Sequence, residues 1–294
     1  MHKTKKSLGL KIGNNFVRAK KALGQNFLKS QLAIKKIIET GEIKPNDIVL
    51  EIGPGKGILT EKLLLVARTV LAIEKDRELF EFLKIKFEKE ISEKKLILIN
   101  DDILKLKIAR QDLAIYKIIA NIPYNITGAI LKKFLTEKHQ PEKMVLMVQH
   151  EVAQRITTPS PSSTRRGKES LLSISVKAYG TPKLIMKVPA RYFSPSPKVD
   201  SAVIEIKNIS RKIFEENKIN EEKFWEIVHL GFAHKRKKLS GNLKQYTGNA
   251  CVLEKLKVLE LKDKRAEELT LKDWISLAKD TTLPSLPLSG EEKN

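Results

Sequence analysis

The sequence predicts an α/β fold, in which helices flank a parallel sheet, followed by a smaller all-α C-terminal domain. Between residues 48 and 148, short apolar runs bounded by turn residues alternate with segments of helical apolar spacing, which is the pattern of successive βαβ units. After Lys207 the apolar residues recur only at helical spacing. With 294 residues, 41% of them hydrophobic, the chain is long enough for one medium and one small domain with a buried core.

The composition favours a cytoplasmic protein with a polyanionic partner. The chain has 56 Lys and Arg against 35 Asp and Glu, a net charge of +21, which favours nucleic acid over a membrane surface. A generally Lys-rich proteome is the alternative explanation. Because Cys251 is the single cysteine, we expect no intrachain disulfide, no cysteine-based metal site and a reducing compartment. The predicted chemistry implies no metal. No apolar run reaches membrane-spanning length, and we expect no secretory signal.

The N-terminal segment is basic and leads into a turn. Residues 1–21 carry seven Lys and Arg and no acid, so we interpret them as a flexible arm that lies along phosphates, with an organelle transit peptide as the alternative. Gly24-Gln25-Asn26 is a turn signal. Ser30 is placed to cap a helix that carries apolar residues at positions 32, 34, 37 and 38.

A glycine-rich turn follows the first predicted strand. The apolar run 48–52 leads into Gly53, Gly55 and Gly57, after which a helix is expected over 58–67. The spacing is G-x-G-x-G, which differs from the dinucleotide fingerprint G-x-G-x-x-G and lacks the G-K-[ST] of a P-loop. Glu51 would repel a pyrophosphate but suits a ligand with a positive centre and no phosphate. The turn therefore indicates S-adenosylmethionine, a sulfonium with an amino-acid tail.

Acidic side chains end the next two predicted strands. Glu74 follows the strand 69–73, where a carboxylate can accept hydrogen bonds from both ribose hydroxyls; an acid at a helix N-terminus is the alternative. The strand 96–99 is followed by Asp101 and Asp102. One of these two carboxylates is expected to accept from the adenine amino group, and the other to be a turn residue.

The segment Asn121-Ile122-Pro123-Tyr124 ends the strand 115–120 and is the centre of the predicted chemistry. The lone pair of an exocyclic amine is delocalised into its ring, so the amine is a poor nucleophile. Acceptors such as the Asn121 amide oxygen and the Ile122 carbonyl can bias it towards tetrahedral geometry, with Pro123 fixing the direction of that carbonyl. Tyr124 can hold the base by stacking. A strand-end turn with a half-buried tyrosine is the alternative.

The segment 127–207 completes the predicted sheet. We expect a helix over 127–135, strands over 144–148, 173–178 and 202–206, and a helix starting within 149–156, with a polar basic loop over 157–170. His150-Glu151 is not a zinc-protease motif, because Gln154 stands where the second histidine is needed.

Two prolines, Pro195 and Pro197, predict a rigid loop that holds Phe193 in a fixed place. A ring there, opposite Tyr124, would complete a sandwich for a flipped base. The alternative is that Phe193 plugs the core beneath the loop.

The C-terminal part is predicted to be a helical module after a polar linker over 208–220. Helices are expected over 221–234, 252–259, 266–269 and 271–278, with a disordered tail over 281–294. The basic cluster 234–238 lies in a stretch without acids and is a candidate for RNA phosphates; a solvated helix face is the alternative.

These motifs together resemble the small-subunit (16S-type) rRNA adenine N6,N6-dimethyltransferase family, whose members dimethylate two adjacent adenines near the 3′ end of that RNA during ribosome biogenesis. The matching segments are collinear and span nearly the whole chain: Leu23–Leu28 (L-G-Q-N-F-L), Leu50–Thr60 (L-E-I-G-P-G-K-G-I-L-T), Glu74, Asp102, Asn121–Tyr124 with Asn125 and Thr127, Val148–Arg155, and Phe193–Val203. The first and last are specific to the group, whereas the glycine turn alone is not. One departure is Glu169-Ser170, where family members often have a Tyr-Gly segment.

The resemblance implies a Rossmann-like S-adenosylmethionine-dependent methyltransferase domain over 22–207 and an RNA-docking domain over 208–280. It implies that Asn26 and Leu28 line the cofactor pocket, that Gly53 and Gly55 hold the methionine part, that Glu74 takes the ribose and that Asp102 takes the adenine. It further implies that Asn121 touches both the cofactor and the target amine, and that Tyr124 and Phe193 stack on the target base. The expected partner is small-subunit rRNA in a partly assembled particle, and the expected form is a monomer.

Three other functions remain to be separated from this one. A methyltransferase of the related large-subunit rRNA group shares the core motifs, but the intact Phe193–Ser201 stretch and the long basic C-terminal module argue against it. A non-catalytic RNA-binding assembly factor would not need Asn121 and Tyr124. A small-molecule methyltransferase would not need a charge of +21.

Overall fold

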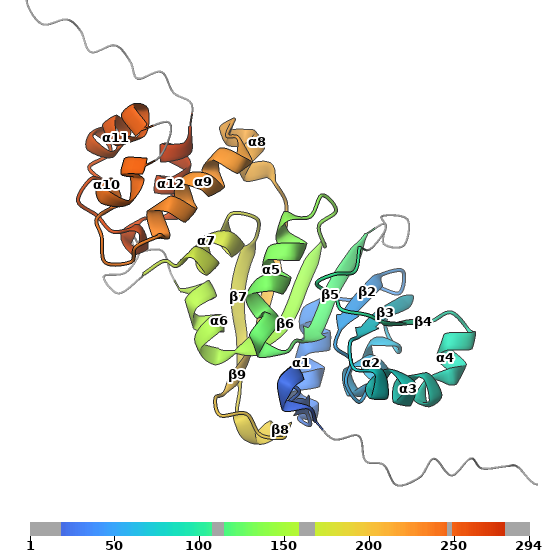
Figure 1. The fold of residues 1–294 in the computed structure, drawn as a ribbon. Coiled ribbons are helices and arrows are strands. Elements are labelled where there is room, and N and C mark those ends of the chain that lie inside the picture. The colour runs from blue at the N-terminus through green and yellow to red at the C-terminus, as the bar shows by residue number, and fades with distance from the viewer. Residues whose placement is uncertain (1–18, 108–114, 159–167, 246–248, 280–294) are drawn as a thin grey trace, which may run out of the picture.

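The computed structural model describes residues 19–107, 115–158, 168–245 and 249–279. Its centre is a seven-stranded sheet of order β4-β3-β2-β5-β6-β9-β7 (Figure 1). The strands are β2 (Ile48–Ile52), β3 (Thr69–Glu74), β4 (Leu96–Asn100), β5 (Tyr116–Asn121), β6 (Lys143–Gln149), β7 (Thr181–Val188) and β9 (Ser201–Lys207). Neighbours from β4 to β6 are parallel, and β9 is antiparallel to both β6 and β7. The predicted parallel α/β sheet is confirmed, with an antiparallel pair at one edge.

Helices cover both faces of this sheet. The α-helices are α1 (Gln31–Gly41), α2 (Ile58–Leu63), α3 (Arg77–Lys86), α4 (Glu88–Ser92), α5 (Thr127–Thr136), α6 (His150–Thr157), α7 (Leu171–Lys177), α8 (Lys212–Asn217), α9 (Glu221–Phe232), α10 (Leu239–Asn242), α11 (Asn249–Val258) and α12 (Leu271–Ala278). Short 3-10 turns are η1 (Lys21–Leu23), η2 (Tyr124–Ile126), η3 (Ala190–Tyr192), η4 (Leu243–Gln245) and η5 (Ala266–Glu268). Side chains of α1, α2 and α3 pack on one face of the sheet, and those of α5, α6 and α7 on the other.

The central strands are buried on both faces, which explains their nearly uninterrupted apolar sequences. In β2, Val49 points to the layer of α1 and α2, whereas Leu50 and Ile52 point to the layer of α5. Ser30 caps α1 as predicted, because its side chain accepts the backbone N–H of Ala33 at 3.2 Å. The strand order reverses between β2 and β5, and this switch point is where ligands bind in such sheets.

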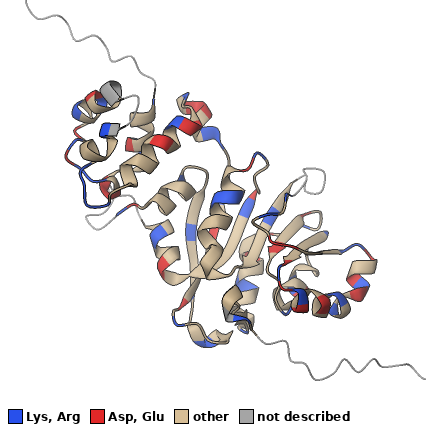
Figure 2. Cartoon of the chain, viewed as in Figure 1, with Lys and Arg blue, Asp and Glu red and all other residues tan. Residues whose placement is uncertain are grey.

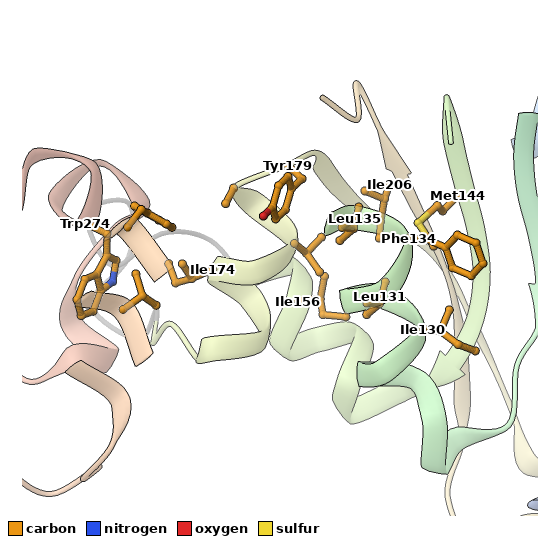
Figure 3. Close-up of a cluster of buried hydrophobic side chains, with 14 of the residues drawn as sticks. Ile130, Leu131, Phe134, Leu135, Met144, Ile156, Ile174, Tyr179, Ile206 and Trp274 are labelled. Carbon is orange, nitrogen blue, oxygen red and sulfur yellow. The ribbon is translucent and has the colours of Figure 1, made fainter. Parts of the chain in front are cut away.

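The C-terminal helices are joined to the sheet by one continuous apolar cluster. Figure 3 shows this cluster running from Phe134 of α5 through Ile174 of α7 to Trp274 of α12. Gly231 of α9 lets Trp274 approach, since a Cβ there would lie 2.3 Å from the indole ring. The boundary predicted at residue 208 stays a prediction, because the core does not stop there.

Two sequence predictions were wrong. Residues 173–178 do not form a strand: Leu171–Lys177 is helix α7, and the strand that borders β9 is β7, eight residues that the sequence did not suggest. The polar linker 208–220 contains helix α8, which Phe214 anchors in the core. Helix α10 was also not predicted.

Some predictions fall outside the described residues. These are most of the basic arm (1–18), the centre of the 157–170 loop and the tail beyond 279. Within the described ranges, no helix combines the length and the apolar character that crossing a membrane requires.

Candidate active site

One cavity lies at the carboxyl ends of β2, β3, β4 and β5, where the sequence placed the site. Its walls come mainly from five stretches of chain, 22–28, 51–59, 73–79, 101–104 and 121–126. Nearly all of the predicted site residues line it, namely Asn26, Leu28, Gly53, Gly55, Glu74, Asp102, Asn121 and Tyr124. Segments far apart in sequence are therefore brought to one edge of the sheet, as the hydrogen bond between Asn121 and Asn26, 95 residues apart, illustrates.

The glycine turn gives the cavity a floor of bare backbone. Gly53, Gly55 and Gly57 have φ angles of +66°, +61° and +75°, which side-chain-bearing residues rarely adopt. At Gly57 there is also no room for a side chain, because a Cβ there would lie 2.5 Å from the Phe87 ring. The turn thus depends on glycine for both backbone conformation and packing.

Glu74 is fixed by backbone donors at the end of β3. One carboxylate oxygen accepts the N–H of Asp76 at 2.8 Å, and the other accepts that of Gly55 at 3.1 Å. Burial raises the pKa of Glu74, although these two hydrogen bonds favour its charged form. Each oxygen keeps a further lone pair, so the carboxylate can accept two hydroxyl groups side by side.

Glu51 lies deeper in the same cavity. Its side chain is 1% exposed, and burial, with the Glu74 charge as a smaller contribution, raises its pKa to about 8. Among the described residues, no hydrogen-bond donor meets its Oε2 atom. A cationic group in the cavity would favour the ionised form of this carboxyl through its charge, which fits the positively charged ligand predicted from the sequence.

Asp101 and Asp102 both reach the cavity, but their partners differ. Asp101 accepts the N–H of Asp102 at 2.6 Å. Asp102 accepts a hydrogen bond from the backbone N–H of Leu104 at 3.0 Å and forms an ion pair with Lys75 at 2.9 Å. The lysine lowers the pKa of the Asp102 carboxyl. Asp102 is therefore held in place by two donors and remains charged.

Asn121 is oriented by its neighbour across the cavity. Its Nδ2 atom donates to the carbonyl of Asn26 at 3.1 Å, so its Oδ1 atom remains as an acceptor without a donor among the described residues. Tyr124 is half-buried beside it, and its hydroxyl lies 2.5 Å from the Ser201 hydroxyl. Burial raises the pKa of Tyr124, so the phenol stays neutral.

Phe193 does not line the cavity. It is 2% exposed and packs in the apolar layer with Leu28 and Val188, while its backbone forms the short strand β8 (Phe193–Ser194), which pairs with β1 (Phe27–Leu28). This is the core position that the sequence left open as the alternative. Stacking of Phe193 on a base stays a prediction that the arrangement of the side chains does not favour.

The sequence of this chain matches known proteins over most of its length. Residues 16–282 match the profile of the family described as "Ribosomal RNA adenine dimethylase". The chain belongs to this family. The "Ribosomal RNA small subunit methyltransferase A" of Dehalococcoides mccartyi (strain CBDB1) is 40% identical, with 89% of this chain and 88% of that protein covered. The protein of the same name from Rippkaea orientalis is 39% identical over 87% of this chain and 95% of its own length.

Solved structures of related enzymes show the same fold. A dimethyladenosine transferase from Plasmodium falciparum superposes with a TM-score of 0.70 at 27% identity, covering 85% of this chain and 95% of its own. The 23S rRNA methyltransferase ErmE gives 0.64 at 26% identity, with 86% of this chain and 98% of that chain covered. The Rossmann-like methyltransferase fold expected from the sequence is therefore confirmed.

Three residues of this adenine dimethylase were not singled out by the sequence reasoning. Lys20, Gln25 and Asp76 form a hydrogen-bonded group at the edge of the cavity. Gln25 enters the sequence argument only through the turn and the Leu23–Leu28 match, without a role of its own, although it directly precedes Asn26. Asp76 lies two residues after Glu74, a spacing that places a second acid at the same strand end. Within the described residues, no group of three or more His, Cys, Asp or Glu is arranged to hold a metal ion.

Proposed function

We propose that this chain transfers methyl groups from S-adenosylmethionine to N6 of two adjacent adenines near the 3′ end of small-subunit rRNA, giving dimethyladenosines during ribosome biogenesis. The observation that carries the proposal is the convergence of Glu74, Asp102, Asn121 and Tyr124 on one cavity beside a glycine turn. Membership of the adenine dimethylase family supports the same conclusion.

The residues of the cavity fit S-adenosylmethionine, which supplies an electrophilic methyl group when it is bound. The two oxygens of Glu74 would take the ribose hydroxyls, and Asp102 the adenine amino group. Gly53 and Gly55 would admit the methionine part close to the backbone, and the nearby Glu51 carboxylate would favour its positive charge. Asn26 and Leu28 would close the remaining wall.

Asn121 and Ile122 would make the target amine reactive. The free Oδ1 atom of Asn121 and the carbonyl of Ile122 can accept its two hydrogens, and these acceptors stabilise the positive charge that develops on nitrogen. Pro123, with φ of −60°, fixes the peptide that carries the Ile122 carbonyl. No general base is needed, because the proton leaves after the bond to carbon has formed. Tyr124 would stack on the base and position it.

The proposed partner is small-subunit rRNA within a partly assembled ribosomal particle, bound by a monomer in the cytoplasm. Helices α8 to α12 would form the docking module. Residues 235–238, between α9 and α10, are all basic and exposed, which suits phosphate contacts (Figure 2).

The test is methyl transfer from tritiated S-adenosylmethionine to unmethylated small-subunit particles, followed by nucleoside analysis. We expect dimethyladenosine with the wild type and none with Asn121→Ala. Gln140→Ala, an amide removed just before β6 and outside the cavity, is the matched control and should retain activity. Tight binding to the particle without methyl transfer to any RNA would instead indicate a non-catalytic assembly factor.

A further inference from the structure

Asp76 is a buried acid beside the cavity that the proposed chemistry does not use. Its carboxylate is fully buried and accepts Lys20 Nζ at 2.8 Å, Gln25 Nε2 at 2.9 Å and the backbone N–H of Glu78 at 3.0 Å. Its own N–H donates to Glu74. The contacts with Glu78 and Glu74 are local, because they belong to the first turn of α3 and to the end of β3. The contacts with Lys20 and Gln25 come from a segment more than 50 residues away in the sequence.

That segment, residues 20–28, forms a strap over the cavity. Residues 22–28 all line the cavity, and Phe27 lies against the glycine turn, since a Cβ on Gly55 would lie 3.1 Å from its ring. One end of the strap is fastened by the pairing of β1 with β8. The other end is fastened at Asp76, and Gln25 joins the two contacts there, because its Oε1 atom accepts the backbone N–H of Lys20 at 2.7 Å.

The two fastenings differ in how easily they can open. The β1 end contains Leu28, which is buried in the core, whereas the Lys20 side chain is 41% exposed. Opening at Asp76 would expose polar groups that water can satisfy, and it would leave the core intact. A ligand enclosed beneath the strap can therefore leave from this side without unfolding the domain.

We propose that Lys20, Gln25 and Asp76 form a latch that holds the strap closed and sets the rate at which S-adenosylmethionine enters the cavity and its demethylated product leaves. This inference rests on the proposed function of the cavity. Placing two methyl groups on each of two adenines requires the spent cofactor to be replaced by fresh S-adenosylmethionine after each transfer, so the latch would act at every transfer.

The experiment measures exchange in full-length variants. Gln25→Leu removes latch contacts without touching α3. Lys20→Met removes them together with the ion pair from Lys20 to Glu78 of that helix at 3.1 Å, and Asp76→Ser removes them while retaining a good helix N-cap. Lys35→Met, on the exposed face of α1, is the matched control. Protein loaded with tritiated S-adenosylmethionine is chased with unlabelled ligand and filtered rapidly, and association is followed in the same way. Intrinsic tryptophan fluorescence is unsuitable, because Trp225 and Trp274 both lie in the C-terminal helices.

We expect both association and dissociation to accelerate in the three latch variants, with dissociation on the order of tenfold faster, the effect of losing one charge-assisted hydrogen bond. The urea unfolding midpoint of Gln25→Leu and Lys20→Met should stay near that of the wild type. Exchange at the wild-type rate in these two variants would overturn the inference, as would an effect seen in Asp76→Ser alone together with a lower midpoint. A wild type that binds no S-adenosylmethionine would instead contradict the proposed function.

Discussion

The hydroxyl groups of Tyr124 and Ser201 lie 2.5 Å apart and join two segments that are 77 residues apart in the sequence. Tyr124 follows the end of β5, and Ser201 is the fully buried first residue of β9. The bond holds the ring that is proposed to stack on the target base.

Ser201→Ala should lower turnover with RNA about tenfold, because the Tyr124 ring loses the partner that orients it. The affinity for S-adenosylmethionine should not change. Tyr124→Phe breaks the same bond, so the double variant should be hardly worse than either single one. The measurement is single-turnover methyl transfer, with Ser92→Ala on the surface of α4 as the control. Additive effects would show that the two hydroxyls act separately.

Glu51 makes stability depend on pH in the ligand-free protein. Its pKa is about 8 in the folded chain and near 4.5 when unfolded, so between these values the folded state holds a proton that the unfolded state releases. The free energy of unfolding should therefore fall as pH rises from about 5 to about 8, by at most about 1.4 kcal/mol per pH unit from this one group. Urea unfolding of wild type and Glu51→Gln across this range measures it, with the exposed Glu39→Gln as the control. We expect the advantage of Glu51→Gln over wild type to grow with pH, and a constant difference would contradict the assignment.

Gly57→Ala should destabilise the fold by at least about 2 kcal/mol, since the residue has a φ angle of +75° and its new Cβ would meet Phe87. Gly128 in α5 provides the matched control, because a Cβ there has no neighbour within 4 Å. Gly128→Ala should be neutral or stabilising by up to about 1 kcal/mol, as is usual for this change in a helix. Urea unfolding compares the two variants, and equal effects would mean that the conformation of the turn does not require glycine.

Phe193→Leu separates the two roles considered for this ring. Because Phe193 is buried among apolar side chains, the variant should lose about 1–2 kcal/mol of unfolding free energy. Tyr192→Leu, at the neighbouring exposed ring, should cost less. Unfolding free energy and methyl transfer are measured together. Unchanged stability with abolished transfer would restore the stacking role and imply that the loop around Phe193 moves on RNA binding.

The sequence was sufficient to predict that most of the candidate residues gather at one cavity, but not to predict their finer contacts. In a parallel sheet, Glu74 and Asn121 must come to the same edge once their strands are recognised, whatever else packs around them. The burial of Phe193 and the Tyr124–Ser201 bond depend instead on how distant segments pack, which no local pattern encodes. The prediction of a strand over 173–178 was wrong for a related reason. Residues 173–176 alternate polar and apolar like a strand, but Ser170 caps a helix there and α7 packs against α6.

Lys143 forms a buried ion pair at the end of the sheet opposite the cavity, and its replacement tests whether that end affects stability alone. It begins β6, is 6% exposed, and its Nζ atom contacts Glu42 at 2.6 Å and Glu205 at 2.9 Å. Lys143→Met should cost about 3–5 kcal/mol, because it removes the cation that faces the buried Glu205 carboxylate. Adding Glu205→Met should recover most of this loss, since an apolar pair leaves no charge unpaired. Methyl transfer well below the unfolding temperature should match the wild type in both variants, because the pair lies at the end of the sheet where the parallel strands begin and the cavity lies where they end. A loss of turnover without a loss of stability would show that this buried ion pair also shapes the site.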